Sequence, residues 1–281
     1  KNLENDALAH LETDVNILQY SVESKKAETL SDAQVVSFNP DVQKAILDND
    51  KKKLKTFASS ILLTKKQAIL TIVSKDGVVL ARGDDPEKIG DSLSGDALVK
   101  KAVNGESVST TVTRDGVVAP TVSIRSAVPI KSGNDTIGAV MVGTEIDNAF
   151  VDGVKSATKL DVSIYADNIR SATTFVSPDG KSRWIGIKEE NSNIKSAVIS
   201  KGKLFVGQAN ILNISYLAAF SPLKDMDNVT VGMLFVGRDK SSLLQAAGKS
   251  IELTFLVSTI LLILSIFPAY LIARNIARQI K

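Results

Sequence analysis

Residue types that build reactive or metal-binding sites are scarce in this sequence. Its 281 residues include no cysteine and a single histidine, His10. Without cysteine, neither a disulfide framework nor a thiolate metal site can form. Because His10 is the only histidine, a metal site or catalytic site built from several histidines is impossible. It also lies in a polar, helix-forming stretch, which is typical of a surface residue. Disulfide scaffolds and histidine-based metalloenzymes are therefore disfavoured.

Concentrated positive charge and catalytic motifs are also missing. The net charge is only +3, and aromatic residues make up 5% of the chain. A nucleic-acid-binding protein usually carries a basic stripe, which this sequence lacks. No Gly-x-Ser-x-Gly, P-loop or EF-hand spacing is present, and the carboxylates of "GDDPE" and of Glu189 and Glu190 are typical of a solvated surface. We expect neither catalysis nor a cofactor.

Charge is absent again near the C-terminus, over "LTFLVSTILLILSIFPAYLIA" from Leu253 to Ala273. About 20 apolar residues cross a bilayer as one helix, and a buried helix of a soluble protein is the alternative. Arg274, Arg278 and Lys281 follow, and positive charge collects on the cytoplasmic side. The sequence predicts a span in the inner (cell) membrane with the preceding residues outside. It starts without methionine, so we also expect a longer protein with an earlier membrane helix and a later cytoplasmic part.

One hairpin pattern occurs twice. "PIKSGNDTIGAVMVG" from Pro129 to Gly143 matches "PLKDMDNVTVGMLFVG" from Pro222 to Gly237, with one residue inserted in the turn. Upstream, "ILTIVSKDGVVLAR" precedes the first copy at nearly the distance at which "DVSIYADNIRSATT" precedes the second. A repeated hairpin usually marks a repeated module. Two related modules in tandem are predicted, with chance similarity of valine-rich strands as the alternative.

The first 26 residues predict a long helix that continues less regularly through "DAQVVSF". Five apolar residues recur at intervals of three and four: Leu8, Leu11, Val15, Leu18 and Val22. Such a stripe forms a dimer seam near the membrane, the face that packs on a sheet, or both along different parts of the helix. Two short helices (41–47 and 51–64) follow, the first capped by Asn39. A sheet of about five antiparallel strands then spans 69–145, and a linking helix covers 149–158.

This order resembles the double Cache extracytoplasmic sensing region of transmembrane receptors. The similarity is carried by "GDDPEKIGDSLSGDALVKKAVNG" in the first module, and by "DVSIYADNIRSATTFVSPDGKSRWIG" and "GMLFVG" in the second. "ARNIARQIK" resembles the start of a HAMP signalling helix. The resemblance implies an α+β fold, in which a long N-terminal helix and two tandem PAS-like antiparallel sheets precede one transmembrane helix. It also implies a homodimer that signals to cytoplasmic partners.

The expected organisation follows from these features. It comprises N-terminal helices (1–66), a membrane-distal module (67–148), a membrane-proximal module (149–239), a connector (240–252), a transmembrane helix (253–273) and the start of a cytoplasmic segment (274–281). The expected function is small-molecule sensing by a methyl-accepting chemotaxis receptor. The sensor of a histidine kinase or a cyclic-di-GMP enzyme is the alternative, and a non-sensing adhesion ectodomain is a weaker one.

Alternation along residues 121–130 suggests where a ligand binds. Val122, Ile124, Val128 and Ile130 share one face, which we expect to pack on the long helix. The opposite face carries Arg125 among small and polar residues, and the resemblance places Glu145 where the family often has an Asp for a ligand amine. The two charges alternatively form a structural ion pair. The candidate ligand-binding residues are Arg125, Ser123, Glu145, Thr121, Met141 and Arg82, and in the second module Tyr165, Arg170, Tyr216 and Trp184 are considered, with Arg170 and Trp184 favoured as structural.

Overall fold

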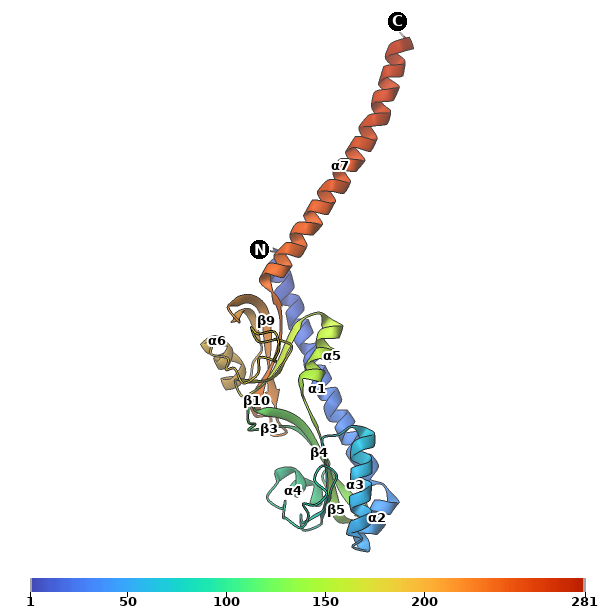
Figure 1. Cartoon of the computed structure of the whole chain (residues 1–281), viewed down its shortest axis with the longest axis vertical. Helices are drawn as coiled ribbons and strands as arrows, with labels where there is room; N and C mark the ends of the chain where they lie inside the picture. The colour runs from blue at the N-terminus through green and yellow to red at the C-terminus, as the bar shows by residue number, and fades with distance from the viewer. Residues whose placement is uncertain (1, 280–281) are drawn as a thin grey trace. The chain divides into compact units, whose positions relative to one another are not determined.

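Figure 1 shows the computed structural model of the chain. The structure describes residues 2–279, apart from the side chains of residues 2, 3, 243, 244, 246, 247, 249, 250, 267 and 269–279. By internal contacts the chain divides into two compact units, Lys1–Gly207 with Ala218–Gly237, and Gln208–Leu217 with Arg238–Lys281. The first unit holds the distal module and most of the proximal module and is described first.

The distal module is a five-stranded antiparallel sheet between helices. Its elements are α1 (Asn2–Ser37), α2 (Pro40–Leu47), α3 (Lys51–Lys65), β1 (Ile69–Ser74), β2 (Val79–Arg82), α4 (Ala97–Val103), β3 (Val108–Arg114), β4 (Thr121–Ser132) and β5 (Asp135–Glu145), with strand order β2-β1-β5-β4-β3. The predicted cap is confirmed, because the Asn39 side chain accepts hydrogen bonds from the backbone N–H groups of Asp41 and Val42. As predicted, Val128 and Ile130 pack with Ala33 and Val36 of the long helix.

The proximal module repeats this arrangement. It contains α5 (Asn148–Thr158), β6 (Asp161–Ala166), β7 (Ile169–Thr173), α6 (Ser192–Lys195), a π-helical turn η1 (Ser196–Ser200), β8 (Phe205–Ile211), β9 (Ile214–Lys224) and β10 (Thr230–Asp239), with strand order β7-β6-β10-β9-β8. The strand orders of the two sheets correspond element by element. The two hairpins recognised in the sequence, β4–β5 and β9–β10, occupy equivalent places, so the prediction of two similar sheets is confirmed.

A glycine shared by the two hairpins has the same physical role in both. A Cβ atom on Gly138 would lie 2.4 Å from the carbonyl oxygen of Val73, and one on Gly232 would lie 1.9 Å from that of Tyr165. Both distances are far below van der Waals contact. Only glycine therefore allows the last strand of each module to approach the first strand this closely.

The apolar stripe of α1 packs within the monomer. Leu11, Val15, Leu18 and Val22 are at most 3% exposed in the single chain. The prediction that this stripe forms a dimer seam is therefore wrong, because its side chains are already covered by the chain's own sheets and helices. Its alternative, the face that packs on a sheet, is confirmed. The outer face of α1 instead exposes Ile17 and Tyr20, at 44% and 73%.

In the second unit, α7 (Lys240–Gln279) is a single helix that contains the expected connector and the uncharged run. Asp239 caps its start, since its carboxylate accepts hydrogen bonds from the backbone N–H and the hydroxyl of Ser241, both at 2.8 Å. Among the described residues, no helix combines the length and apolar character of a membrane span. The side chains of residues 269–273 of the predicted span and of the predicted cytoplasmic start lie outside the described residues.

Candidate functional site

Strand register brings the predicted ligand-binding residues to one face of the distal sheet. Arg125 lies opposite Gly143 on β5 and Thr110 on β3. Two residues before Arg125 on β4, Ser123 pairs with Glu145 of β5. Two residues after Arg125, Ala127 pairs with Met141 of β5. Side chains two residues apart on a strand share a face. This face, which we call the Arg125 face, is covered by α4 and lies opposite the face that packs on α1.

Arg125 is buried without a counter-ion. Its side chain is 4% exposed, and its one hydrogen bond within the described structure is a long one, 3.4 Å from Nε to the Ser123 hydroxyl. No carboxylate of a described residue lies within ion-pair distance of the guanidinium. Burial lowers the pKa of Arg125, and the nearby charge of Arg114 lowers it further. An arginine nevertheless stays protonated, so the site holds an uncompensated positive charge.

The space around this guanidinium depends on a glycine. A Cβ atom added to Gly143 would lie 3.3 Å from Cγ of Arg125. A side chain at Gly143 would therefore crowd the stem of Arg125. Asp96, which caps α4, and Asp84 raise the pKa of Arg125 from a distance beyond ion-pair range. Their field partly offsets the cost of burying the charge without binding it directly.

The second predicted arginine is already engaged. Arg82 makes a two-pronged ion pair with Asp91, at 2.7 and 2.8 Å, and also donates to the backbone carbonyl of Lys88. This contact lowers the pKa of Asp91 to about 2, chiefly through the hydrogen bond from Arg82. Arg82 therefore fixes the loop that follows β2, and its charge is neutralised by the protein itself.

The remaining predicted residues differ in their surroundings. Met141 is 5% exposed and packs with α4 in the core. Thr121 and Glu145 are exposed at the ends of their strands. No ion pair joins Glu145 to Arg125 in the part of the chain that the structure describes, although Glu145 lies near enough to raise the pKa of Arg125. The alternative of a structural ion pair between them is therefore not observed.

Thr110 and Met226 also belong to the Arg125 face and were not identified from the sequence. The backbone N–H of Met226, in the β9–β10 turn, donates to the Thr110 hydroxyl at 2.8 Å. The Met226 side chain packs on the core cluster that contains Met141. The two residues are 116 positions apart, and no local pattern links positions so distant. Through them the proximal module closes one side of the face that holds Arg125.

The equivalent face of the proximal module is filled by its own side chains. In the repeat, Phe220 and Phe235 stand where the distal module has Ala127 and Met141, and their ring centroids are 5.0 Å apart. Ala218 stands in place of Arg125. The proximal module thus has no cation at the position equivalent to Arg125, and aromatic rings fill the neighbouring space.

The candidate ligand-binding residues of the proximal module pack in this core. Arg170 is 4% exposed and donates to the Tyr165 hydroxyl at 3.0 and 3.2 Å and to the Trp184 carbonyl at 3.3 Å. Its guanidinium also lies over the Tyr165 and Phe175 rings. Burial raises the pKa of Tyr165, and Tyr216 is buried as well. Arg170 therefore joins β7 to the segment that contains Trp184.

Among the described residues, no group of three or more His, Asp or Glu side chains is placed to hold a metal ion. The chemistry available on the Arg125 face is instead that of anion recognition. A guanidinium offers parallel donors that match a carboxylate. Hydroxyls of Ser123 and Thr110 stand beside it, and an exposed carboxylate, Glu145, stands at the edge.

Comparison with known proteins gives the same architecture. Residues 144–250 match the family described as Single cache domain 3. The periplasmic domain of Vibrio cholerae LuxQ is 13% identical, with a TM-score of 0.54 over 82% of this chain and 100% of that chain. The sensor domain of the V. cholerae histidine kinase DctB is 9% identical, with a TM-score of 0.55 over 84% and 98%.

The ligand-binding domain of the Campylobacter jejuni chemoreceptor Tlp3, in complex with 4-methylisoleucine, is 11% identical. Its TM-score is 0.56, over 86% of this chain and 94% of that chain. At such identities the similarity concerns the fold. No curated protein matches the chain in sequence.

Proposed function

Because residues 144–250 match a Cache family and the chain shares the fold of periplasmic and ligand-binding sensor domains, we propose that it is a Cache-like sensing region whose distal module binds a small anionic metabolite and signals through α7. The role that we propose is ligand sensing rather than catalysis. The observation that carries the proposal is Arg125, which is buried, positively charged and without a carboxylate partner. A buried charge is costly unless it is paired, and a ligand carboxylate supplies the missing partner.

We propose an amino acid or a related carboxylate as the ligand. The carboxylate would lie against Arg125, with Ser123 and Thr110 as neighbouring hydroxyls. Glu145 would accept the ammonium of an amino acid, while Thr121 and Met141 would line the edges and Arg82 would hold the adjacent loop. The proximal module would act as a relay, since Phe220 and Phe235 occupy the corresponding place.

A ligand screen tests this proposal. Amino acids, dicarboxylates and amines are added to the purified chain, and each change in melting temperature is followed by calorimetric titration. We expect a carboxylate ligand whose binding is lost in Arg125→Ala. The exposed Lys131→Ala variant removes one positive charge from the same module and should bind normally. If Arg125→Ala binds as tightly as the wild type, the ligand does not lie on the Arg125 face.

The route of the signal is part of the proposal. Thr110 lies beside Arg125 and accepts the hydrogen bond from Met226 in the β9–β10 turn. β10 then runs without interruption into α7 at Lys240. A ligand that draws Arg125 and β3 together would therefore move this hairpin. Such a change requires that the ligand bind the two states with different affinity.

We propose the membrane anchor at residues 253–273, within α7, with the modules outside the cell membrane. The uncharged sequence supports it, as do the exposed apolar side chains Phe255, Leu261 and Ile263, at 76%, 61% and 61%. Apolar surface of this extent needs a partner or lipid. The full chain should stay with membranes after an alkaline wash, and release into the supernatant would refute the anchor.

We further propose a homodimer formed through the outer face of α1. Ile17, Tyr20, Ser24 and Ala27 follow one another at intervals of three and four and are exposed, which is the spacing of a helix pair. Cysteine at Tyr20 should cross-link two receptors in membranes. Cysteine at the buried Val15 is the matched control and should not. Cross-linking at neither Tyr20 nor Ile17 would refute this interface.

A chemotaxis receptor is the output that we favour, on the family resemblance. The sensor of a histidine kinase is the second candidate, because the DctB sensor domain has the same fold. The two differ in what the ligand changes in the full-length receptor. A chemoreceptor alters swimming bias through adaptation by methylation, whereas a kinase alters its own phosphorylation, and an assay of both readouts decides between them.

A further inference from the structure

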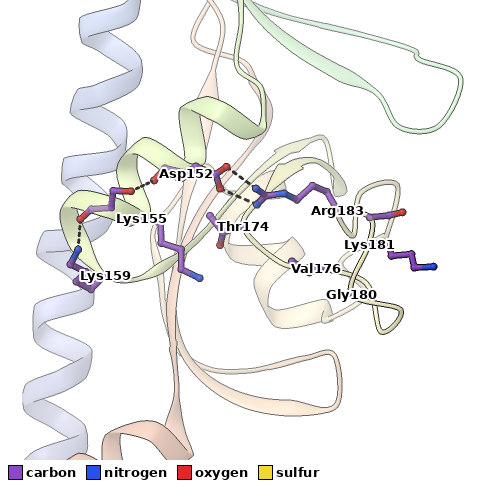
Figure 2. A pocket seen from close by; sticks show the side chains of 10 residues that line it. Asp152, Lys155, Lys159, Thr174, Val176, Gly180, Lys181 and Arg183 are labelled. Atoms are coloured by element: carbon purple, nitrogen blue, oxygen red, sulfur yellow. Dashed lines mark hydrogen bonds and ion pairs between the residues drawn. The ribbon is translucent and has the colours of Figure 1, made fainter.

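A charged cavity lies in the proximal module, away from the Arg125 face. It has a volume of about 660 Å³ and lies between α5 and the turn that follows β7 (Figure 2). Most of the residues that line it are of polar types: Asp152, Lys155, Ser156, Lys159, Thr174, Val176, Gly180, Lys181, Ser182 and Arg183. Four of these side chains are cationic and one is anionic. We call this cavity the α5 cleft.

Two of the four cations are neutralised by the protein. Arg183 makes a two-pronged ion pair with Asp152, at 2.7 and 2.9 Å, which ties the turn to α5 (Figure 2). Lys155 lies 2.6 Å from a carboxylate oxygen of Asp161, just outside the cleft. These contacts fix the walls and leave their two cations with little unmet charge.

The other two cations have no carboxylate partner among the described residues. The Lys159 ammonium donates to the backbone carbonyl of Ser156 at 2.8 Å, which does not neutralise its charge. Lys181 stands on the opposite wall, on the turn, and its ammonium points outward at the rim (Figure 2). The lysine stem is flexible, so this ammonium can turn toward an anion in the cleft.

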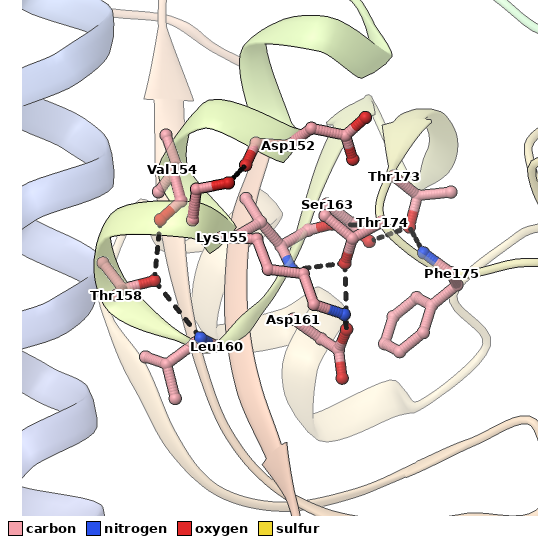
Figure 3. A network of polar contacts seen from close by, with 12 residues as sticks. Asp152, Val154, Lys155, Thr158, Leu160, Asp161, Ser163, Thr173, Thr174 and Phe175 are labelled. Carbon is pink, nitrogen blue, oxygen red and sulfur yellow. Dashed lines mark hydrogen bonds and ion pairs between the residues drawn. The ribbon is translucent and has the colours of Figure 1, made fainter.

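Below the cleft, Thr174 belongs to a network of polar contacts (Figure 3). The Thr174 hydroxyl donates to Asp161 at 3.0 Å and accepts from the Val162 backbone N–H at 3.0 Å. Its only hydrogen-bond donor is therefore used and is not available to an anion. The charges of the α5 cleft that lack a carboxylate partner among the described residues are the Lys159 and Lys181 ammonium groups. An ammonium acts as a compact point charge and does not impose a planar, bidentate geometry on its partner.

We propose that the α5 cleft binds a soluble, multivalent oxyanion between Lys159 and Lys181. Lysine recognises charge more than geometry, in contrast to the fork of an arginine. Affinity should therefore rise with the charge of the anion and fall with ionic strength. This site would be independent of ligand binding at Arg125. The alternative is that Lys155 and Lys159 bind no ligand and only stabilise α5, by interacting with the negative C-terminal end of its dipole.

Titration calorimetry on the full chain tests the proposal with inorganic phosphate and citrate as probes, at low and at 0.5 M salt. Citrate should bind several-fold more tightly than phosphate, and both should weaken at high salt. The double variant Lys159→Gln/Lys181→Gln should weaken citrate binding roughly tenfold, since charge-assisted contacts contribute most of the affinity. The control Lys201→Gln/Lys203→Gln removes the same charge from exposed positions of the same module and should change it less than twofold.

The proposal is overturned if neither anion binds, or if the two double variants weaken binding equally. Binding to phosphatidylglycerol vesicles without binding of the soluble anions would also overturn it, because it would point to a lipid headgroup. Arg125→Ala should leave phosphate binding unchanged. That variant separates the α5 cleft from the ligand site proposed on the distal module, so either proposal can fail alone.

Discussion

Replacing Arg125 with methionine should make the ligand-free protein more stable while abolishing ligand binding. Methionine keeps an unbranched apolar stem and removes the charge. The guanidinium is 4% exposed, and its one hydrogen bond within the described structure, to Ser123, is 3.4 Å long. An arginine placed there for stability would have stronger partners. The expected sign of the effect therefore distinguishes a ligand-binding arginine from a structural one.

The magnitude follows from the contacts. Replacing buried, poorly compensated charge by apolar groups of similar size stabilises by about 1–2 kcal/mol. The long hydrogen bond to Ser123 offsets at most about 0.5 kcal/mol of that gain. A net gain of about 1 kcal/mol raises the melting temperature by roughly 2–4 °C in a domain of this size.

Arg170→Met is the matched control, because Arg170 is equally buried but well bonded. Its loss removes three hydrogen bonds, two of them to Tyr165. At about 1 kcal/mol each, with the Tyr165 hydroxyl left buried and unsatisfied, the cost is about 3 kcal/mol. The melting temperature should fall by roughly 6–12 °C.

Thermal unfolding followed by circular dichroism measures both variants without ligand. Calorimetric titration with the ligand found in the screen then measures binding. A fall of more than about 5 °C in Arg125→Met, comparable with that in Arg170→Met, would show that Arg125 is structural. The argument from the missing counter-ion would then be refuted.

Three further outcomes are expected. The pKa of Asp91 is about 2, below its ordinary 3.8, so its ion pair with Arg82 stabilises the fold above about pH 4 and is lost as the pH falls toward 2. Asp91→Asn should accordingly flatten the acid limb of the unfolding free energy, and an unchanged limb would contradict this. Thr110→Val should leave a backbone N–H of the β9–β10 turn without its acceptor, cost about 1–3 kcal/mol and speed hydrogen exchange there; unchanged exchange would mean that the contact does not persist in solution. Gly232→Ala should prevent β10 from pairing with β6 in the proximal sheet. Gly153→Ala, whose new Cβ would meet no neighbouring element within 4 Å, should instead stabilise α5 by about 0.5–1 kcal/mol in chemical denaturation. Equal effects of the two substitutions would refute the steric argument.

The sequence by itself determined the repeated architecture. The two hairpin patterns carry the period of strands, and Gly138 and Gly232 mark the same close approach in both copies. Asn39 before Pro40 specified a helix start, because capping depends on neighbouring residues alone. Alternation along β4 was likewise sufficient to place Arg125 opposite the face that packs on α1, since side-chain direction in a strand follows from local geometry.

Tertiary structure decided what each pattern is used for. The spacing of Val15 and Leu18 fits a dimer seam and a packed face equally well, and only burial within the monomer chose between them. Arg82 and Arg125 both lie on strands, but Asp91 neutralises the first and no described carboxylate binds the second. The contact of Met226 with Thr110 joins residues 116 positions apart. Counter-ions, burial and contacts between modules arise from chain segments that meet only on folding. Local sequence patterns therefore do not predict them.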